Sequence, residues 1–434
     1  MSSPNILIIT THDTGRFIEP YGVTTVETPA LARLAAEGAC FNAYTTAPQC
    51  SPSRSSLTTG RYPHANGTMG LTHRDFAWDL HPTEQTIPQV LRTAGYRSGH
   101  WGVEHAAKDP RRIGNDVYDE SREIDAIVAG VSEFIDADCA RPFVVQVGFV
   151  ETHRIGGRRD IHDRHGFGGE PYIRKGITVP AYLVDGADTR ADLADFQGCV
   201  RRADIQIGRL IALLEERRIL DETLVLYVSD HGIAFPRAKC SLYDPGIEIS
   251  LIARLPGTVL SGGAAPLGMA SILDVLPTLV ELTGATRPPD LHGTSLLPLA
   301  AGATSGHAEV FVEKTYHSYY DPMRGIRTNR WKLIRNFETG LGVEIPSDIA
   351  GSGAYRDVAG RLQPSHHVAV ELYDLREDPH EQTNVAGCSD TAAVESELNS
   401  KLVSWMQASA DPLLDGPVRS PFYGAVLDDV GQVG

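Results

Sequence analysis

Two apolar runs that each end in polar residues constrain the fold of this chain most. Residues 5–11 read Asn-Ile-Leu-Ile-Ile-Thr-Thr, and residues 223–229 read Thr-Leu-Val-Leu-Tyr-Val-Ser. Continuous runs of this kind predict parallel strands that are buried on both faces. Such strands need helices against both sides of their sheet. We therefore expect an α/β protein built on a large, doubly wound mixed sheet flanked by helices.

The spacing of apolar residues predicts the helices that this sheet needs. The segment from Asp188 to about Leu220 repeats apolar residues at helical spacing over its whole length. Shorter amphipathic segments are also expected to be helical, at residues 29–38, 85–94 and 124–138. A further buried strand is predicted at residues 142–150.

A change of composition near residue 305 predicts a second, smaller domain. Pro288-Pro289 and the small-residue run Ala300–Gly306 are typical of a boundary. We expect a catalytic α/β domain over residues 1–305 and a C-terminal α+β domain over residues 306–434 with a small antiparallel sheet. Its expected strands are residues 310–313, 325–328 and 331–336. The Gly- and Arg-rich loop at residues 156–169 is expected to be an exposed rim or lid.

Polar residues follow both buried strands directly. His12-Asp13 comes after the first strand, and Asp230-His231 comes after the second. Open α/β sheets build their sites at the carboxyl ends of strands, so the two pairs are candidates to converge on one cation. The alternative is that each pair belongs to an ordinary turn, since Asp and Gly are common there.

Residues 50–60, Cys-Ser-Pro-Ser-Arg-Ser-Ser-Leu-Thr-Thr-Gly, carry the clearest chemical signal. Cys50 stands two residues before a Pro, where a loop could turn into a helix, and free N–H groups there favour anions. Arg54, one turn further on, could grip the same anion. The pattern predicts a nucleophile at Cys50 that attacks an oxyanion ester. The alternative is a buried structural cysteine beside a helix start.

Together these motifs resemble the type I, formylglycine-dependent sulfatase family of the alkaline-phosphatase-like superfamily. The resemblance covers most of the chain and continues through further motifs, at residues 28–38, 60–64, 95–99, 151–154, 229–232, 239–246 and 371–384. Tyr320–Arg324 and Phe235-Pro236 look most like the heparan N-sulfatase branch, the N-sulfoglucosamine sulfohydrolases.

The resemblance implies that Cys50 is oxidised to formylglycine by a formylglycine-generating enzyme. The hydrated aldehyde would attack a sulfate ester or N-sulfate of a small molecule or sugar. One divalent cation is implied, Ca²⁺ first and Mn²⁺ or Mg²⁺ as alternatives, held by Asp13, Asp230, His231 and the residue derived from Cys50. Many relatives have Asp where this chain has His12. Whether His12 is a ligand or only packs beside the ion stays open, and the loss of a carboxylate favours a nitrogen-tolerant ion such as Mn²⁺.

The resemblance also assigns roles around the sulfate group. Arg54 would hold the diol and the sulfate, and Lys239 would bind a sulfate oxygen and the leaving-group oxygen. His153 follows the strand at residues 142–150 and would act with Lys239 as general acid to the leaving group.

His105 matches the histidine that helps the reaction intermediate collapse. Relatives usually have a Lys two residues earlier, where this chain has Val103, and Lys108 is a candidate to replace it. Four further residues lie near matched motifs and are candidates for contacts to the substrate: His73, Asp75, His317 and Arg324.

Charge and composition limit the partners. A net charge of −16 disfavours binding to nucleic acid or to an anionic membrane. No segment reaches the roughly 20 apolar residues of a membrane span. The six Cys show no CxxC spacing, and no secretory signal is visible, so a cytoplasmic protein is expected. A homo-oligomer is compatible with the sequence.

Two other functions stay open at this stage. A phosphonate monoester or phosphodiester hydrolase could use the same scaffold, and the Asp230-His231 pair is compatible with it. A catalytically silent binding relative would result if Cys50 were never converted.

Overall fold

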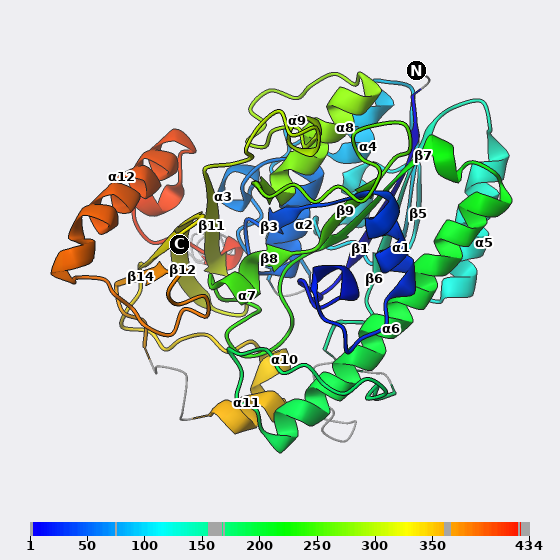
Figure 1. Ribbon diagram of the computed structural model, residues 1–434. Helices are drawn as coiled ribbons and strands as arrows, with labels where there is room; N and C mark the ends of the chain where they lie inside the picture. Colours follow the sequence, from blue (N-terminus) through cyan, green and yellow to red (C-terminus); the bar gives the residue numbers. More distant parts are fainter. Residues whose placement is uncertain are drawn as a thin grey trace.

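A computed structural model describes residues 3–73, 76–154, 167, 170–359, 366–423 and 426 of the chain. Figure 1 shows a large sheet with helices on both sides and, to its left, a smaller sheet covered by helix α12 (Ala392–Ala408). In the described part of the chain, no helix is both long and apolar enough to cross a membrane.

The large sheet has seven strands in the order β2-β9-β7-β1-β6-β4-β5. Their bounds, in that order, are Ala39–Cys40, Leu251–Arg254, Thr223–Ser229, Asn5–Thr11, Phe143–Phe149, Arg97–Gly102 and Val117–Asp119. The strands from β7 to β5 run parallel, whereas β9 is antiparallel to both β7 and β2. The predicted mixed sheet is thus confirmed, and two predicted strands match β1 and β7 to the residue.

The register of the central strands brings their carboxyl ends to one level. Thr11 at the end of β1 pairs with Ser229 at the end of β7 and with Phe149 at the end of β6. Gly102 at the end of β4 pairs with Gly148. Gly102 has a φ of +84°, and a Cβ there would lie 2.2 Å from the Gly148 carbonyl oxygen, so only glycine fits. Whatever follows these four strands therefore meets at one edge of the sheet.

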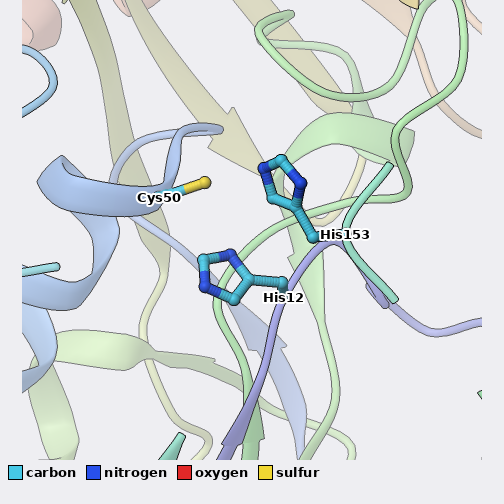
Figure 2. A group of neighbouring side chains, drawn as sticks. All are labelled: His12, Cys50 and His153. Atoms are coloured by element: carbon cyan, nitrogen blue, oxygen red, sulfur yellow. The ribbon is translucent and has the colours of Figure 1, made fainter. Parts of the chain in front are cut away.

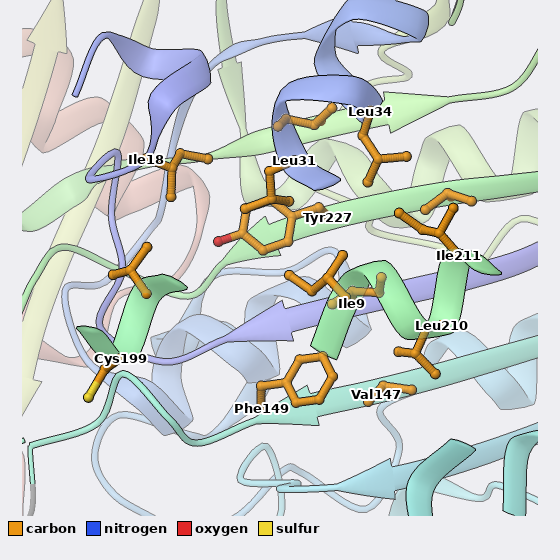
Figure 3. Packing of buried hydrophobic residues seen from close by; sticks show 14 of the residues in the cluster. Ile9, Ile18, Leu31, Leu34, Val147, Phe149, Cys199, Leu210, Ile211 and Tyr227 are labelled. Carbon is orange, nitrogen blue, oxygen red and sulfur yellow. The ribbon is translucent and has the colours of Figure 1, made fainter. Parts of the chain in front are cut away.

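Alternate residues of the central strands face opposite helical layers. Ile9, Val147 and Tyr227 belong to the cluster packed by α1 (Pro29–Glu37), α5 (Ile124–Ala137) and α6 (Ala187–Glu216), part of which Figure 3 shows. Ile8, Val144 and Leu226 face the opposite layer, formed by three helices: α2 (Cys50–Thr59), α4 (Ile87–Arg92) and α8 (Val275–Thr283). Burial of each such side chain contributes about 1.5–3 kcal/mol.

Helix α4 is shorter than the predicted segment 85–94. Thr86 and Gln89 form a capping box, so the helix begins at Ile87. The other predicted helices agree with α1, α5 and α6 to within a few residues.

The smaller sheet is antiparallel, with the order β11-β12-β13-β14. Its strands are Glu309–Tyr316, Tyr320–Thr328, Trp331–Asn336 and Val370–Asp374. The first three contain the predicted strands, while β14 was not predicted. One face packs on α12, and the other packs against Tyr44 and Leu242 of the large domain. The boundary at residue 305 stays a prediction. Most of the predicted loop 156–169 lies outside the described residues.

Short elements connect the two sheets. A three-stranded sheet combines β10 (Met269–Ser271), β3 (Asn42–Tyr44) and β8 (Glu248–Ile249). The remaining short helices are α3 (Pro63–Asn66), α7 (Asp244–Ile247), α9 (Leu297–Ala300), α10 (Ser347–Ala350) and α11 (Gly353–Val358). Helix α11 packs against α6, where the Ala354 N–H donates to Asp192 over 2.9 Å. This contact ties the segment that carries α10 to the large domain.

Candidate active site

Four adjacent parallel strands deliver polar residues to one edge of the sheet. His12-Asp13 follows β1, Glu104-His105 follows β4, Thr152-His153 follows β6, and Asp230-His231 follows β7. The start of α2 lies over this edge. Figure 2 shows the Cys50 side chain, at the first turn of α2, pointing toward the rings of His12 and His153.

Cys50 is the first residue of α2 and is buried. Its Sγ lies 3.4 Å from Nε2 of His231. Burial raises the pKa of the Cys50 thiol well above its usual value, so the thiol stays protonated. A protonated thiol is a poor nucleophile, because the thiolate is the reactive form.

Asp13, Asp230 and His231 form a buried cluster beneath Cys50. The Asp13 N–H donates to Oδ1 of Asp230 over 2.9 Å, and Nε2 of His231 lies 3.1 Å from Oδ1 of Asp13. Nδ1 of His231 lies 3.0 Å from the Gly232 carbonyl oxygen and donates to it, so Nε2 is the ring nitrogen directed at the cluster. Asp13, Cys50 and His231 each offer a ligand-type atom within 4.8 Å of the other two, an arrangement that a cation between them would stabilise.

His12 lies at the same cluster. Its Nδ1 is 3.3 Å from Oδ2 of Asp230, and its ring meets those of His105 and His153 edge-on at 5.2 and 5.3 Å. Burial, reinforced by the nearby Arg54 guanidinium, lowers the pKa of His12 well below its usual value. The neutral imidazole is thus chemically able to act as a ligand.

Arg54 reaches the cluster from the second turn of α2. Its Nε lies 3.1 Å from Oδ2 of Asp230, and its Nη1 donates to Thr10 Oγ1 and to the Val103 carbonyl, each over 3.2 Å. Its Nη2 is buried and has no hydrogen-bond partner among the described residues. Arg54 therefore holds one donor available for an anion.

Lys239 bridges two carboxylates. Its Nζ lies 3.1 Å from Oδ2 of Asp13 and 2.7 Å from Oδ2 of Asp348. Burial alone would lower the pKa of Lys239, but the two carboxylates outweigh burial and raise the pKa well above its usual value. Lys239 is therefore a protonated donor at neutral pH.

Two more histidines complete the site and are held mostly neutral. Burial, with a contribution from Lys239, lowers the pKa of His153. Burial, with a contribution from Arg54, lowers the pKa of His105 to about 3. Arg54 is the cation found next to Val103, whereas Lys108 is exposed to solvent.

The four candidate substrate residues have different outcomes. His73 stacks on His105 with 5.7 Å between ring centroids, and Nδ1 of His317 lies 3.3 Å from Oε1 of Glu344. Asp75 lies outside the described residues. The prediction for Arg324 is wrong: Arg324 is fully buried in β12 and bonds Asp411 through Nε (2.5 Å) and Nη2 (3.0 Å), which leaves it no access to a substrate.

Asp348 is the residue of this site that the sequence did not indicate. It lies in the short helix α10 and is separated from Lys239 by 109 positions. No strand or recognisable spacing precedes it, so only the packing of its segment against the large domain could reveal it.

Comparisons with known proteins agree with this geometry. The sequence model of the sulfatase family matches residues 4–285, and a model described as N-sulphoglucosamine sulphohydrolase, C-terminal, matches residues 232–353. Human N-sulphoglucosamine sulphohydrolase is 29% identical, covering 95% of this chain and 92% of that protein. An ulvan-active sulfatase from Formosa agariphila is 25% identical, covering 94% and 75%.

Solved structures show the same fold. A protein solved in complex with its substrate D-glucosamine-2-N,6-O-disulfate has a TM-score of 0.70 at 20% identity, covering 96% of this chain and 99% of that one. A 2-O GAG sulfatase has a TM-score of 0.71 at 20% identity, covering 97% and 96%. The match to the sulfatase family model spans the large sheet and all four strand ends. This chain therefore belongs to the sulfatase family and is a sulfuric ester hydrolase.

Proposed function

We propose that this sulfatase removes the N-linked sulfate of an N-sulfated glucosamine, with an oxygen nucleophile made from Cys50 by a formylglycine-generating enzyme. The position of Cys50 carries the proposal. Its Sγ lies 3.4 Å from Nε2 of His231 and within 4.8 Å of a ring nitrogen of His153, so a sulfate bound at this position would meet both groups. The human relative and the C-terminal family match support an N-sulfated sugar as substrate.

Conversion of Cys50 would replace a buried, protonated thiol by an aldehyde, whose hydrate supplies hydroxyl groups for attack on sulfur. The first turn of α2 surrounds this position with buried small side chains, including Ser51 and Ser53. Such small side chains would leave room for an anion at the start of the helix, where unpaired backbone N–H groups favour negative charge.

The residues beneath Cys50 fit a divalent cation. Oδ1 of Asp13 is buried without a hydrogen-bond partner in the described part of the chain, and Nε2 of His231 lies 3.1 Å from it. Asp13, Asp230 and His231 would hold the ion, with His12 and the converted Cys50 beside it. Bound there, the ion would neutralise sulfate charge and acidify the nucleophile. The carboxylates suit Ca²⁺, and the imidazoles make Mn²⁺ the alternative.

The remaining residues act on the two ends of the sulfate group. Nη2 of Arg54 would donate to a sulfate oxygen. Lys239 and His153 would face the leaving nitrogen, which must gain a proton to depart as an amine. His153 rests neutral, but the negative charge of a bound sulfate raises the pKa of a neighbouring imidazole and so favours its acid form. His105 and His12, both neutral, each keep a ring nitrogen that can accept a hydrogen bond.

Turnover of N-sulfoglucosamine by wild type and Cys50→Ala tests this proposal, with glucosamine and inorganic sulfate measured separately. We expect both products in equal amounts from wild type and none from Cys50→Ala, whose fold should persist because Cys50 lies at the site edge of α2. A phosphonate monoester assayed in parallel covers the other chemistry of this scaffold. Faster turnover of the phosphonate, or wild-type turnover by Cys50→Ala, would contradict the proposal.

A further inference from the structure

The Asp348 carboxylate has one oxygen in a hydrogen bond and one oxygen without a hydrogen-bond partner among the described residues. Oδ2 accepts a hydrogen bond from Lys239 over 2.7 Å. Oδ1 is buried and has no hydrogen-bond partner among the residues that the structure describes, and the whole residue is only 7% exposed. A buried carboxylate oxygen without a donor is unfavourable, so a donor from a bound molecule would stabilise it.

Asp348 lies beside Lys239 and His153, the two residues proposed to act on the leaving group. Asp13, His153 and Asp348 each place a ligand-type atom within 4.8 Å of the other two, and so do His12, Cys50 and His153. His153 is common to both groups, so Asp348 and the Cys50 sulfur both lie close to His153. Lys239, the other donor to the leaving group, contacts Asp348 directly.

We infer that Oδ1 of Asp348 accepts a hydrogen bond from the nitrogen of the departing amine and thereby selects N-sulfates over O-sulfates. This inference rests on the proposed function of the site. The nitrogen of an N-sulfate carries a hydrogen, which a carboxylate can accept. The bridging oxygen of a sulfate ester carries none, and its lone pairs would face the negative carboxylate.

The preference grows along the reaction. As the S–N bond breaks, a new S–O bond forms to the attacking oxygen, and the electron pair of the broken bond stays on nitrogen. The nitrogen takes one proton from His153 or Lys239 and leaves as a neutral amine with two N–H bonds. When this proton reaches the nitrogen ahead of S–N cleavage, the nitrogen carries positive charge until the bond pair returns to it. That charge strengthens its hydrogen bond to a carboxylate, so Asp348 stabilises the transition state more than the bound substrate.

Holding Lys239 in place is the other role that Asp348 could have. Lys239 keeps a second carboxylate, Asp13, at 3.1 Å, so loss of Asp348 leaves it paired. A purely positioning role would affect every substrate that Lys239 touches, whereas contact with the leaving nitrogen affects only substrates that have one.

Kinetics of Asp348→Asn on two substrates separate these roles. We expect kcat for N-sulfoglucosamine to fall about 10- to 100-fold, the effect typical of losing one charge-assisted hydrogen bond. Turnover of 4-nitrophenyl sulfate should change less than about 3-fold, since its leaving oxygen carries no hydrogen for Asp348 to accept, whereas a displaced Lys239 would also lose its contact with the sulfate oxygens of this substrate. Asp348→Glu, which keeps the charge, should recover part of the N-sulfate rate.

Asp321→Asn is the matched control. Nζ of Lys314 lies 2.7 Å from an Asp321 oxygen and 2.9 Å from a Glu344 oxygen. The same substitution therefore removes one of two carboxylates from another buried lysine. Its ratio of N-sulfate to aryl turnover should equal that of wild type. Equal losses on both substrates in Asp348→Asn, or no loss on either, would overturn the inference alone. Wild type that hydrolyses the aryl sulfate but not N-sulfoglucosamine would overturn the proposed substrate as well.

Binding in the Cys50→Ala background gives a readout that needs neither turnover nor conversion of Cys50. Calorimetry with the product glucosamine should show affinity at least about 10-fold weaker when Asp348→Asn is added. Affinity for glucose, which lacks the amine, should stay the same. Equal weakening for both sugars, or for neither, would overturn the inference.

Discussion

Replacement of Lys239 by Met should destabilise the folded protein strongly, because two buried carboxylates then face each other without a cation. The Asp13 and Asp348 groups offer oxygen atoms within 4.8 Å of one another. At an effective dielectric constant of about 20, two unit charges at this distance repel by about 3.5 kcal/mol. This value agrees with the roughly 3–5 kcal/mol lost when one partner of a buried ion pair is removed. We therefore expect the free energy of unfolding to fall by about 3–5 kcal/mol.

Urea unfolding in metal-free buffer measures this loss, and a second substitution identifies its cause. Adding Asp348→Asn to Lys239→Met removes one of the two charges and should restore most of the lost stability. Adding Asp321→Asn instead should restore none, since Asp321 pairs with Lys314. If Lys239→Met lies within about 1 kcal/mol of wild type, or if Asp348→Asn destabilises it further, the electrostatic reasoning is refuted.

Three further predictions concern His153, the metal cluster and His100, a buried residue of β4. His153→Ala should slow N-sulfoglucosamine turnover by roughly 10²- to 10⁴-fold and turnover of activated aryl sulfates only modestly, since only the amine needs a proton. If turnover by His153→Ala depends on leaving-group pKa as turnover by wild type does, His153 is excluded as the acid. Exhaustive chelation should abolish turnover and lower the melting temperature, because the ion binds only the folded state. Addition of Ca²⁺ or Mn²⁺ should restore both. Full activity in protein shown to be metal-free by elemental analysis would contradict this prediction. Burial, with Arg54, lowers the pKa of His100 to about 3, so the unfolded chain takes up a proton at a higher pH than the folded chain. The free energy of unfolding should therefore fall as pH drops below about 6.5, by up to about 1.4 kcal/mol per pH unit. Urea unfolding of His100→Gln should show a shallower pH dependence, and an unchanged slope would contradict burial as the cause.

The sequence was most informative where local pattern and tertiary environment agree. The strands at residues 5–11 and 223–229 are buried on both faces, so their continuous apolar runs predicted both ends of each strand correctly. Because the strands are parallel, the residues after them meet at one edge, and the predicted grouping of Asp13 with Asp230 followed from topology alone. The grouping of Cys50 and Lys239 with them depended on the family resemblance.

The residues that the sequence analysis missed depend on contacts between distant segments. Asp348 enters the site only because α10 and α11 pack back against the large domain. Arg324 carries a charge within a matched motif, but Asp411, 87 positions away, pairs with it in the interior. Strand β14 is too short for its alternation to stand out and is fixed by pairing with β13, as Leu333 opposite Leu372 shows.

The mass of the peptide that carries Cys50 tests the central claim most directly. Trypsin should release residues 34–54, which contain both Cys40 and Cys50. Conversion of Cys50 makes this peptide about 18 Da lighter, whereas the first steps of ordinary cysteine oxidation add oxygen. After alkylation, we expect the lighter peptide from active protein to carry one alkyl group, on Cys40, with an aldehyde at position 50. Active protein whose peptide has unmodified mass and two alkylated cysteines would contradict the account.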